Sequence, residues 1–386
     1  MERKNGTAKL STNRSEMKRN QRGLIGRLIV FLLAVLAFVG LLAMAMSVLS
    51  SFVNPLKFVW PAFFGLAFWV IFIYNVVILA LLLLMWSRKA WISIIALTIA
   101  IPGVVKSFSM GTPQDGGQLR VMTYNVQMFV DINDRGKTQR EVAEGVAKMV
   151  MGNLPDVLCV QEFNQFLPKT SRDACIALFG EMTHLPYHHY NQKSNYCNNV
   201  IFSRYPLTAI EEDIPFAKQN AYGTVAKVDA GEQGTFYVLC CHLTSFQLTN
   251  DELTVFSETN KSKEQVQEYG KSIITKLKKA YERRSEEVGK MLESIPHDGR
   301  PILMCGDFND TPISYTYHQI KDMGFVDGFV KAGKGIGYTY AGKLPLLRID
   351  YVWGNGQIEP TACTRIKFKG SDHYPVMMDF NVIHGL

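Results

Sequence analysis

Two long stretches without any charged residue limit what this chain can fold into. Residues 28–55 and 58–87 contain no Asp, Glu, Lys or Arg over 28 and 30 positions, respectively. A helix that spans a membrane needs about 20 mostly apolar residues, whereas a soluble helix of such length normally keeps a polar face. The sequence therefore predicts membrane-spanning helices here rather than a pair of helices buried in a soluble core.

A third apolar run, residues 90–105, decides how often the chain crosses the membrane. It has only 16 residues and contains Pro102, but Arg88, Lys89 and Lys106 bracket it. We expect it to span, which gives a transmembrane region over residues 28–106 with three helices at about 28–50, 58–86 and 90–105. A cleaved signal peptide is a poor alternative for the first run, because that run exceeds the roughly 7–15 apolar residues of a signal core and further apolar runs follow.

The distribution of basic residues predicts the orientation. Residues 1–27 hold eight Lys or Arg and two Glu, and such a basic tail stays in the cytoplasm. Arg88 and Lys89 mark a second cytoplasmic point. With three spans, everything after Lys106 lies outside the inner or plasma membrane, whereas with two spans it lies in the cytoplasm. We expect three spans, and hence a multi-pass membrane protein whose main domain is extracytoplasmic.

The rest of the chain is mildly acidic. The whole sequence has a formal net charge of +7, but residues 107–386 hold 29 basic and 32 acidic residues, a net charge of −3. The basic excess thus belongs to the membrane part, which weakens the case for tight binding to nucleic acid. All seven cysteines lie beyond residue 158, and four of them sit in apolar runs: Cys159, Cys240, Cys241 and Cys305. We expect buried free thiols, which favour a reducing compartment. This disagrees with the charge pattern, which places the domain outside the cytoplasm.

The soluble part follows a short polar segment. Residues 107–118 are rich in Gly, so we expect a linker to one domain over residues 119–386. The apolar pattern predicts helices over residues 140–151 and 261–294. Strands are expected at residues 119–126, 156–161, 199–203, 223–228, 235–243, 301–306, 349–353 and 376–380. Strands with intervening helices predict an α/β (α+β) domain.

Polar side chains collect where these strands begin or end, positions at which a sheet presents side chains rigidly and within reach of solvent. They are Asn125, Glu162, His242, Asp307, Asn309, Asp350, Asp372 and His373. Four carboxylates with Asn and His, and without a zinc-type cysteine spacing, fit a hard cation such as Mg²⁺, with Mn²⁺ as a substitute. Taken singly, each residue is more simply a turn, a helix cap or a solvated strand end. Their joint occurrence favours a metal site that polarises a phosphoester.

The domain resembles the endonuclease/exonuclease/phosphatase superfamily, the metal-dependent phosphoesterases related to deoxyribonuclease I, exonuclease III and neutral sphingomyelinase. The resemblance runs from residue 119 to about 381 and rests on seven segments in family order. These are 119–125 (LRVMTYN), 156–162 (DVLCVQE), 199–206 (NVIFSRYP), 242–243 (HL), 306–309 (GDFN), 348–351 (RIDY) and 371–375 (SDHYP). The resemblance implies a four-layer αββα sandwich of two mixed β-sheets, preceded here by the all-α transmembrane region.

The resemblance also implies a metal site. Glu162 corresponds to the principal metal ligand, and Asp372 to a further acidic residue beside the metal. Asn125 and Asn309 correspond to residues that hold the metal site and the scissile phosphate. Asp307 corresponds to the residue at the metal site that positions or deprotonates the attacking water.

Three further residues complete the catalytic set that the resemblance implies. His373 corresponds to the histidine on the phosphate, and Asp350 to the carboxylate that orients it. His242, in Cys-Cys-His-Leu, is similar to the deoxyribonuclease I, sphingomyelinase and phosphatase branches rather than to the exonuclease III branch. It is therefore a candidate general acid.

The sequence thus predicts a membrane-anchored, Mg²⁺-dependent hydrolase in which water attacks a phosphoester. The substrate is open between nucleic acid and a phospholipid head group, and between diester and monoester. The alternative is a catalytically silent membrane scaffold, which is disfavoured because no expected catalytic position is missing. No partner is inferred besides the substrate and the lipid bilayer. A polar insertion over residues 244–279 is either a substrate-selecting lid or a solvated helical decoration.

Overall fold

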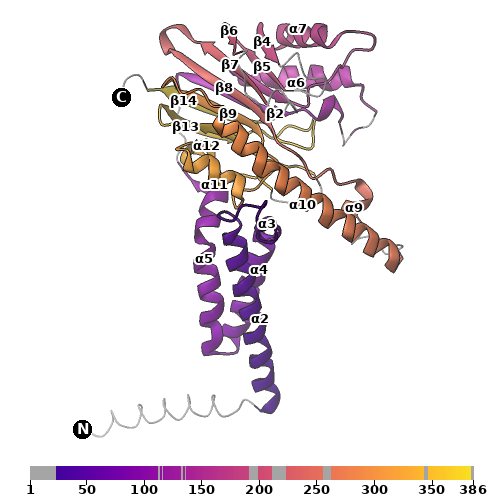
Figure 1. The fold of residues 1–386 in the computed structure, drawn as a ribbon, viewed down its shortest axis with the longest axis vertical. Helices are drawn as coiled ribbons and strands as arrows, with labels where there is room; N and C mark the ends of the chain where they lie inside the picture. The colour runs from indigo at the N-terminus through magenta and orange to yellow at the C-terminus, as the bar shows by residue number, and fades with distance from the viewer. Residues whose placement is uncertain are drawn as a thin grey trace, which may run out of the picture.

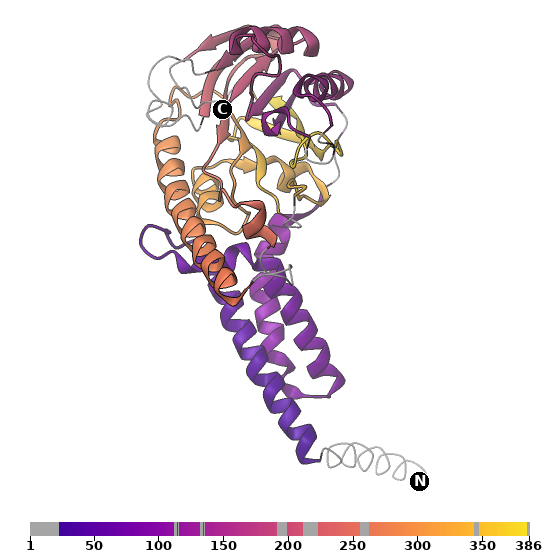
Figure 2. The ribbon, with the colours of Figure 1, turned by 90° about the vertical axis from the view of Figure 1, so that its right-hand side faces the viewer.

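A computed structural model describes most of the chain. It covers residues 23–111, 114, 116–131, 134, 136–190, 199–210, 223–254, 262–342 and 347–383. Figures 1 and 2 show a column of helices that carries a larger body of strands and helices at one end. We call the column, residues 24–107, the helical base, and the body, residues 119–383, the sandwich domain.

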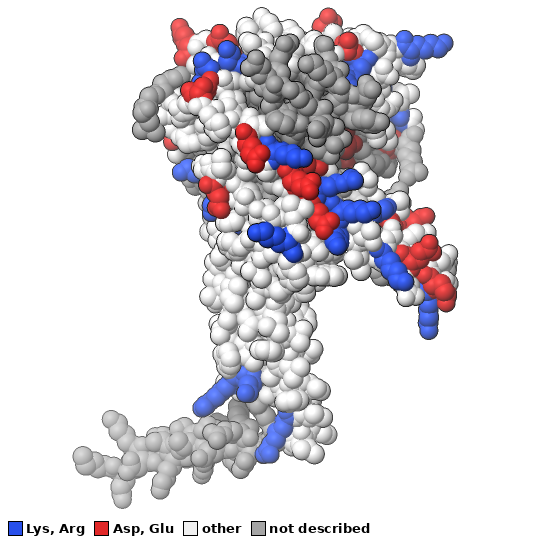
Figure 3. Space-filling model, in the orientation of Figure 1, with Lys and Arg blue, Asp and Glu red and all other residues white. Residues whose placement is uncertain are grey.

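Four helices form the helical base: α2 (Leu24–Leu49), α3 (Trp60–Leu66), α4 (Phe68–Leu84) and α5 (Trp91–Ser107), with a 3-10 turn, η1 (Arg88–Ala90), before α5. In the described part of the chain, α2 and the stretch from Arg88 to Ser107 are each long and apolar enough to cross a membrane. Helices α3 and α4 meet at an angle of 69°, so this pair is a third crossing only if it counts as one broken span. Figure 3 shows basic side chains at the end of the column away from the sandwich domain and none of either sign along the face drawn.

The segment expected to be a linker is partly structured. Strand β1 (Phe108–Met110) follows α5 directly and pairs antiparallel with β11 (Lys334–Ile336). Residues 112, 113 and 115 lie outside the described part. The Arg348 guanidinium donates to the carbonyl of Lys106 at 2.8 Å, so the end of α5 is held against the sandwich domain.

Two six-stranded mixed sheets form the sandwich domain. The first has the order β13-β14-β2-β3-β5-β4 and the second the order β10-β12-β9-β8-β7-β6. The strands of the first sheet are β2 (Leu119–Asn125), β3 (Val157–Gln161), β4 (Tyr187–Tyr190), β5 (Val200–Ser203), β13 (Ile358–Arg365) and β14 (Val376–Val382). Those of the second are β6 (Leu207–Ala209), β7 (Gly223–Asp229), β8 (Thr235–His242), β9 (Ile302–Asp307), β10 (Val326–Asp327) and β12 (Asp350–Gly354). Each sheet has one parallel pair at its centre, β2 with β3 and β8 with β9.

Helices cover the outer face of each sheet (Figure 1). Over the first sheet lie α6 (Gln139–Asn153) and α7 (Arg172–Thr183), and over the second α10 (Lys263–Glu293) and α11 (Tyr315–Asp322). Shorter elements are η2 (Gln127–Phe129), η3 (Gly231–Gln233), α9 (Asn250–Thr254) and α12 (Gly328–Ala332). A third apolar cluster fills the space between the sheets. The predicted four-layer αββα sandwich is therefore confirmed.

Cysteines pack in these cores as the sequence predicted. Cys159, Cys240 and Cys305 lie between the sheets, and Cys241 lies under α10. All four are buried free thiols. Burial raises the pKa of Cys159 and Cys241 well above that of an ordinary thiol, so these groups behave as small apolar side chains.

Strands β8 and β9 approach each other closely at Gly306. Gly306 has φ +145°, and a Cβ atom there would lie 1.9 Å from the carbonyl oxygen of Cys241. The parallel register pairs Cys241 with Gly306 and then His242 with Asp307. Glycine at 306 thus lets the two strands carry His242 and Asp307 out side by side.

Gly306→Ala is expected to destabilise the protein by more than about 3 kcal/mol, because either the β8–β9 pairing or the positive φ must be given up. Thermal unfolding of the purified chain measures this. Gly289→Ala is the matched control: this glycine lies within α10 with nothing within 4 Å of the added Cβ, and the change should stabilise by about 0.5–1 kcal/mol. Equal melting temperatures for Gly306→Ala and the unmodified chain would contradict the expectation.

Candidate functional site

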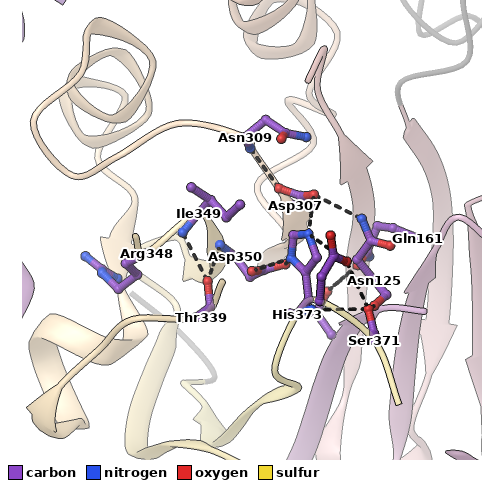
Figure 4. Close-up of polar contacts among 12 residues, drawn as sticks. Asn125, Gln161, Asp307, Asn309, Thr339, Arg348, Ile349, Asp350, Ser371 and His373 are labelled. Carbon is purple, nitrogen blue, oxygen red and sulfur yellow. Dashed lines mark hydrogen bonds and ion pairs between the residues drawn. The ribbon is translucent and has the colours of Figure 1, made fainter. Parts of the chain in front are cut away.

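The polar residues singled out in the sequence meet where the two sheets close on each other. Asn125 ends β2, and Glu162 directly follows β3, which pairs parallel with β2. In the second sheet, Asp307 lies opposite His242 on one side and opposite Asp350 on the other. Figure 4 shows Asn125 from the first sheet converging with Asp307 and Asp350 from the second, together with His373 from the loop before β14.

An asparagine amide joins the two sheets at this point. Nδ2 of Asn125 donates to Oδ2 of Asp307 at 3.0 Å and to Oε1 of Glu162 at 3.2 Å. Its Oδ1 accepts from the backbone N–H of Gln127 at 3.0 Å. In this arrangement Asn125 holds two carboxylates at a fixed separation, and its own oxygen is already engaged by the backbone.

His373 lies between two carboxylates. Its Nδ1 is 2.9 Å from Oδ2 of Asp350, and its Nε2 is 3.6 Å from Oδ2 of Asp307 (Figure 4). Burial alone would lower the pKa of His373, but the charges of Asp350, Asp307 and Asp372 outweigh burial and raise that pKa to about 10. The imidazole is therefore held as a cation whose Nε2 faces the site.

Few positively charged side chains lie near the carboxylates of Glu162, Asp307 and Asp372. Burial raises the pKa of Asp307 and of Asp372, and the nearby charge of His373 only partly offsets this. His242 adds one more ring, with Nε2 at 3.7 Å from Glu162 and 3.8 Å from Asp307. Among the residues that the structure describes, no Lys or Arg forms an ion pair with these acids. Crowded oxygens of one sign, partly buried, are the donor set that a hard divalent cation stabilises.

The backbone around the site is strained. Glu162 has φ +54°, Asn309 has φ +51°, and Gln127, Met128 and Phe129 have φ between +47° and +57°. Left-handed backbone is uncommon for residues other than glycine and persists where the surrounding structure enforces it. Here it turns Glu162 out of the end of β3 and toward Asp307.

The carboxylates suggest two overlapping ligand sets. Asp307, Asp350 and His373 offer ligand atoms that all lie within 4.8 Å of one another. However, the His373 ring already faces Asp350 through Nδ1, so this trio is better explained as a hydrogen-bonded chain of charges. The second set, Glu162 and Asp372 with Asp307, is spread more widely than this trio. The Asn125 amide links Glu162 to Asp307, and Asp372 Oδ1 lies 3.9 Å from Nε2 of His373.

Asn309 is placed differently from the other predicted residues. Its Nδ2 donates to the carbonyl of Leu243 at 3.0 Å, and its backbone N–H donates to Oδ1 of Asp307 at 2.8 Å. The side chain lines the pocket, but its amide nitrogen is used to hold the loop after β8. Asn309 thus fixes Asp307 from the opposite side to Asn125.

Sequence reasoning gave no role to several residues that support the site. Ser371 Oγ donates to the carbonyl of Asn125 at 2.8 Å and accepts from the N–H of His373 at 3.2 Å. Thr339 Oγ1 accepts from the N–H of Asp350 at 3.0 Å. Gln127 Oε1 accepts from the N–H of Asp372 at 3.1 Å. Ser371 lies in the segment 371–375 that carries the family resemblance, whereas no motif or periodicity in the sequence marks Gln127 or Thr339.

A pocket of about 280 Å³ opens over these residues. One side is polar and includes Glu162, Asp307, Asp372 and His373. Tyr340 stands at the edge, with its ring centroid 5.5 Å from that of His373. Burial and the charges of Asp372 and Asp307 raise the pKa of Tyr340 to about 12, so this hydroxyl stays protonated and can donate a hydrogen bond.

Comparison with protein families agrees with this geometry. The model described as "Endonuclease/Exonuclease/phosphatase family" matches residues 122–373, more than half of the chain. The chain belongs to this family. Members of the family hydrolyse phosphoester bonds and generally depend on divalent metal ions. A second model, described as a domain of unknown function (DUF8431), matches residues 27–107.

Solved structures with a similar fold come from several sources. An endonuclease/exonuclease/phosphatase from Beutenbergia cavernae DSM 12333 is 17% identical, with a TM-score of 0.48 over 69% of this chain and 72% of that one. A family protein from Leptotrichia buccalis C-1013-b is 17% identical, with a TM-score of 0.45 over 68% and 99%. The human Nocturnin catalytic domain with bound sulfate is 15% identical, with a TM-score of 0.41 over 68% and 94%. No curated protein was found to match the chain.

The pairing of Asp350 with His373 predicts a pH-dependent contribution to stability. Because the folded-state pKa of about 10 lies above the ordinary value of 6.5, the pairing stabilises the fold fully below pH about 6.5 and is lost as the pH rises through about 10. Asp350→Asn removes the nearest negative charge, so the pKa of His373 should fall. Histidine-ring NMR titration in EDTA reports this pKa directly.

Asp322→Asn is the control for that titration, since Asp322 lies 3.2 Å from His318 and should leave His373 unchanged. An unaltered His373 pKa in Asp350→Asn would refute the pairing. Activity gives a second test: Asp350→Asn combined with His373→Ala should be little worse than His373→Ala alone, because residues that act as one unit are not additive.

Proposed function

We propose that this protein is a membrane-anchored, Mg²⁺-dependent hydrolase that cleaves a phosphoester by attack of water. The observation that supports this best is the fixed, partly buried cluster of Glu162, Asp307 and Asp372, whose negative charge lacks a balancing Lys or Arg in the described part of the chain. The Ser371 hydroxyl contacts Asp372 at 3.4 Å, but it is buried and already bonded to the carbonyl of Asn125 and the N–H of His373, so it is not free to attack. Water is then the attacking group.

Glu162 and Asp372 would hold the cation, with an oxygen of Asp307 at its edge and Asn125 keeping Glu162 and Asp307 apart. Carboxylate oxygens are the ligands that Mg²⁺ prefers, and Mn²⁺ accepts the same set. When bound, the ion polarises the phosphoryl oxygens and stabilises charge on the leaving oxygen. The amide of Asn125 fixes the geometry, which is the usual task of a neighbour to metal ligands.

The protein side chains would manage the protons. Asp307, which Asn125 and Asn309 hold from two sides, positions a water molecule and takes one of its protons. The water oxygen forms a bond to phosphorus while the bond from phosphorus to the leaving oxygen breaks. His242 gives a proton to that leaving oxygen, and both side chains return to their starting states by exchange with solvent.

His373 would act on the phosphate. Its cationic ring presents Nε2 toward Asp307 and the pocket, and Asp350 fixes its orientation from behind. A cation that is already in position stabilises the extra negative charge of the pentacoordinate transition state without reorganisation. Asp350 is a positioning residue in this scheme, because it acts through His373.

We further propose that the helical base anchors the protein in the inner or plasma membrane by three spans. Three features support this: the apolar helix α2, the apolar stretch Arg88–Ser107, and the bent pair α3–α4 if it is counted as one broken crossing. Helix α2, which the basic tail precedes in the sequence, begins at the end of the column where the Arg88–Lys89 turn lies (Figure 1), and the positive-inside rule assigns this end to the cytoplasm. The sandwich domain would then be extracytoplasmic.

The substrate within the phosphoester class is either a nucleic acid or a phospholipid head group. The net charge of −3 over residues 107–386 disfavours tight binding to a duplex, which depends on Lys and Arg neutralising phosphates. The helical base brings lipid head groups within reach. Diester and monoester cleavage both fit the side chains present.

Removal of metal provides the first test. EDTA should abolish hydrolysis of chromogenic phosphoesters by the purified full chain, and Mg²⁺ or Mn²⁺ should restore it. Glu162→Gln should lower kcat/KM by about 100-fold or more, because a neutral amide is a far weaker ligand. Glu232→Gln, an exposed glutamate in the turn η3, is the matched control and should leave activity unchanged. Full activity in the presence of EDTA would refute the proposal.

Protease protection on intact spheroplasts tests the orientation. Three spans predict cleavage within the sandwich domain without lysis, together with protection of the Arg88–Lys89 turn. Two spans predict a protected sandwich domain, whereas the loop around Lys57 is accessible and the Arg88–Lys89 turn is protected in both cases. Lysed spheroplasts, in which both regions should be cut, provide the control for folding and for protease access.

A further inference from the structure

The pocket over the carboxylates is not built by the sandwich domain alone. Its polar side comes from β3, β9 and the loop before β14, as described above. Its lining also includes a set of half-buried apolar side chains, which we call the apolar wall: Leu66, Phe246, Leu248, Leu253 and Leu347. Leu66 ends α3, so one wall residue belongs to the helical base, outside the residues that match the phosphoesterase family.

Helix α3 has the features of a segment that lies along a membrane surface. It meets α4 at 69°, so if α4 crosses the bilayer, α3 runs roughly parallel to its surface. Trp60 at its start and Phe58 just before it are 52% and 50% exposed. Aromatic side chains are enriched at the level of the lipid head groups. Figure 1 places α3 between the column of helices and α10.

A continuous set of aromatic rings connects this surface with the pocket. Ring centroids are 5.5 Å apart from Trp60 to Phe63, 5.7 Å from Phe63 to Tyr281, and 5.4 Å from Tyr281 to Phe246. The last of these rings lines the pocket. Aromatic side chains are therefore in contact all the way from the exposed start of α3 to the pocket, through the buried ring of Tyr281.

The Phe246 end of this wall is fixed to the loops that carry Thr244 and Asp310, next to the carboxylates. The buried Arg284 of α10 lies 4.5 Å from the Phe246 ring and donates to the carbonyl of Thr244 at 2.9 Å. Its Nε also contacts Oδ2 of Asp310 at 3.3 Å, and Asp310 directly follows Asn309. The apolar wall and the polar end of the pocket are thus parts of one rigid arrangement.

Resting on the proposed function, we infer that this pocket binds an amphiphile, with a lipid phosphoester group at the carboxylates and its hydrocarbon chain on the wall formed by Leu66, Phe246 and Leu253. The volume of about 280 Å³ lies at the lower limit of about 300 Å³ for small-molecule sites, which suits a head group and the start of a chain. A neighbouring cleft behind Leu66 measures about 20 Å³, room for a single water. In this proposal the chain leaves past α3 toward the bilayer surface, since the cleft behind Leu66 is too small to hold it.

Two esters that differ only in chain length test this inference. Methyl p-nitrophenyl phosphate and hexadecyl p-nitrophenyl phosphate share the phosphodiester and the leaving group. With the full chain in phosphatidylcholine vesicles and Mg²⁺, kcat/KM should be at least about tenfold higher for the hexadecyl ester, because the wall holds its chain so that the phosphoester lies against the carboxylates. Leu66→Gln should remove most of this ratio.

Leu56→Gln is the matched control. Leu56 is 48% exposed, lies in the turn before α3 and does not line the pocket, so its replacement should leave the ratio unchanged. Since all variants share the same vesicles, partitioning of the hexadecyl ester into the bilayer cancels in the comparison between them.

Photolabelling gives a readout that does not depend on turnover. Phosphatidylcholine with a diazirine in its acyl chain should label the peptide 244–254 of the sandwich domain, and Leu66→Gln should reduce that label at least about threefold, with Leu56→Gln having no effect. Equal kcat/KM for the two esters without label in 244–254 would overturn the inference while leaving the proposed function standing. Leu66-dependent label without hydrolysis of either ester would support lipid binding and count against the proposed reaction.

Discussion

Negative charge crowded between two sheets is the constraint on which the rest of the site depends. Asp307 is buried between His242 and Asp350 in its own sheet, and Asn125 reaches it from the other sheet. Such an arrangement is unfavourable unless every oxygen has a donor or a cation nearby. The amide of Asn125, the backbone of Asn309 and the ring of His373 meet part of this need, and a divalent cation would meet the remainder. The left-handed backbone at Glu162 follows from the same requirement, because acids on separate strands must be turned toward one point. Gln127, also left-handed, holds the backbone of Asp372 through its side chain.

The helical base is joined to the sandwich domain by close backbone contact. Ser50 Oγ donates to the carbonyl of Ile313 at 2.5 Å, and the Ile313 side chain packs among Met44, Phe68 and Ala100. Gly65 lies where a Cβ atom would be 2.5 Å from the Ile313 carbonyl oxygen. Because Ile313 is only four residues beyond Asn309, the loop that holds Asp307 is also the loop that rests on the base. A displacement of the base would therefore be transmitted to the site through a short, packed segment.

The sequence predicted the sandwich and most of the residues that meet at the candidate site, for identifiable reasons. Central strands such as β3 and β9 are buried on both faces, so they read as unbroken apolar runs, and the polar residue at each end is conspicuous. Strand β13 was not predicted, because Ile358–Arg365 mixes polar residues with Pro360, next to which the pairing with β14 shifts register. Short edge strands such as β6 and β10 carry too few residues for a pattern. Residues that serve the site through backbone contacts, such as Thr339 and Gln127, have no periodicity to reveal them, and the contribution of Leu66 depends on tertiary packing alone.

The bend between α3 and α4 shows that the apolar run 58–87 is not one straight helix, which its length alone did not reveal. A straight helix over those residues would take Leu66 into the column and away from the pocket. In the structure the break at Ala67 leaves α4 with 17 residues, about 25 Å of helix at 1.5 Å per residue, which is shorter than the roughly 30 Å of hydrocarbon that a span must cross. A crossing by α4 is therefore complete only if α3 lies at the surface and supplies the remaining depth. If α4 crosses the bilayer as proposed, the bend that completes the crossing is also the bend that brings Leu66 into the pocket wall.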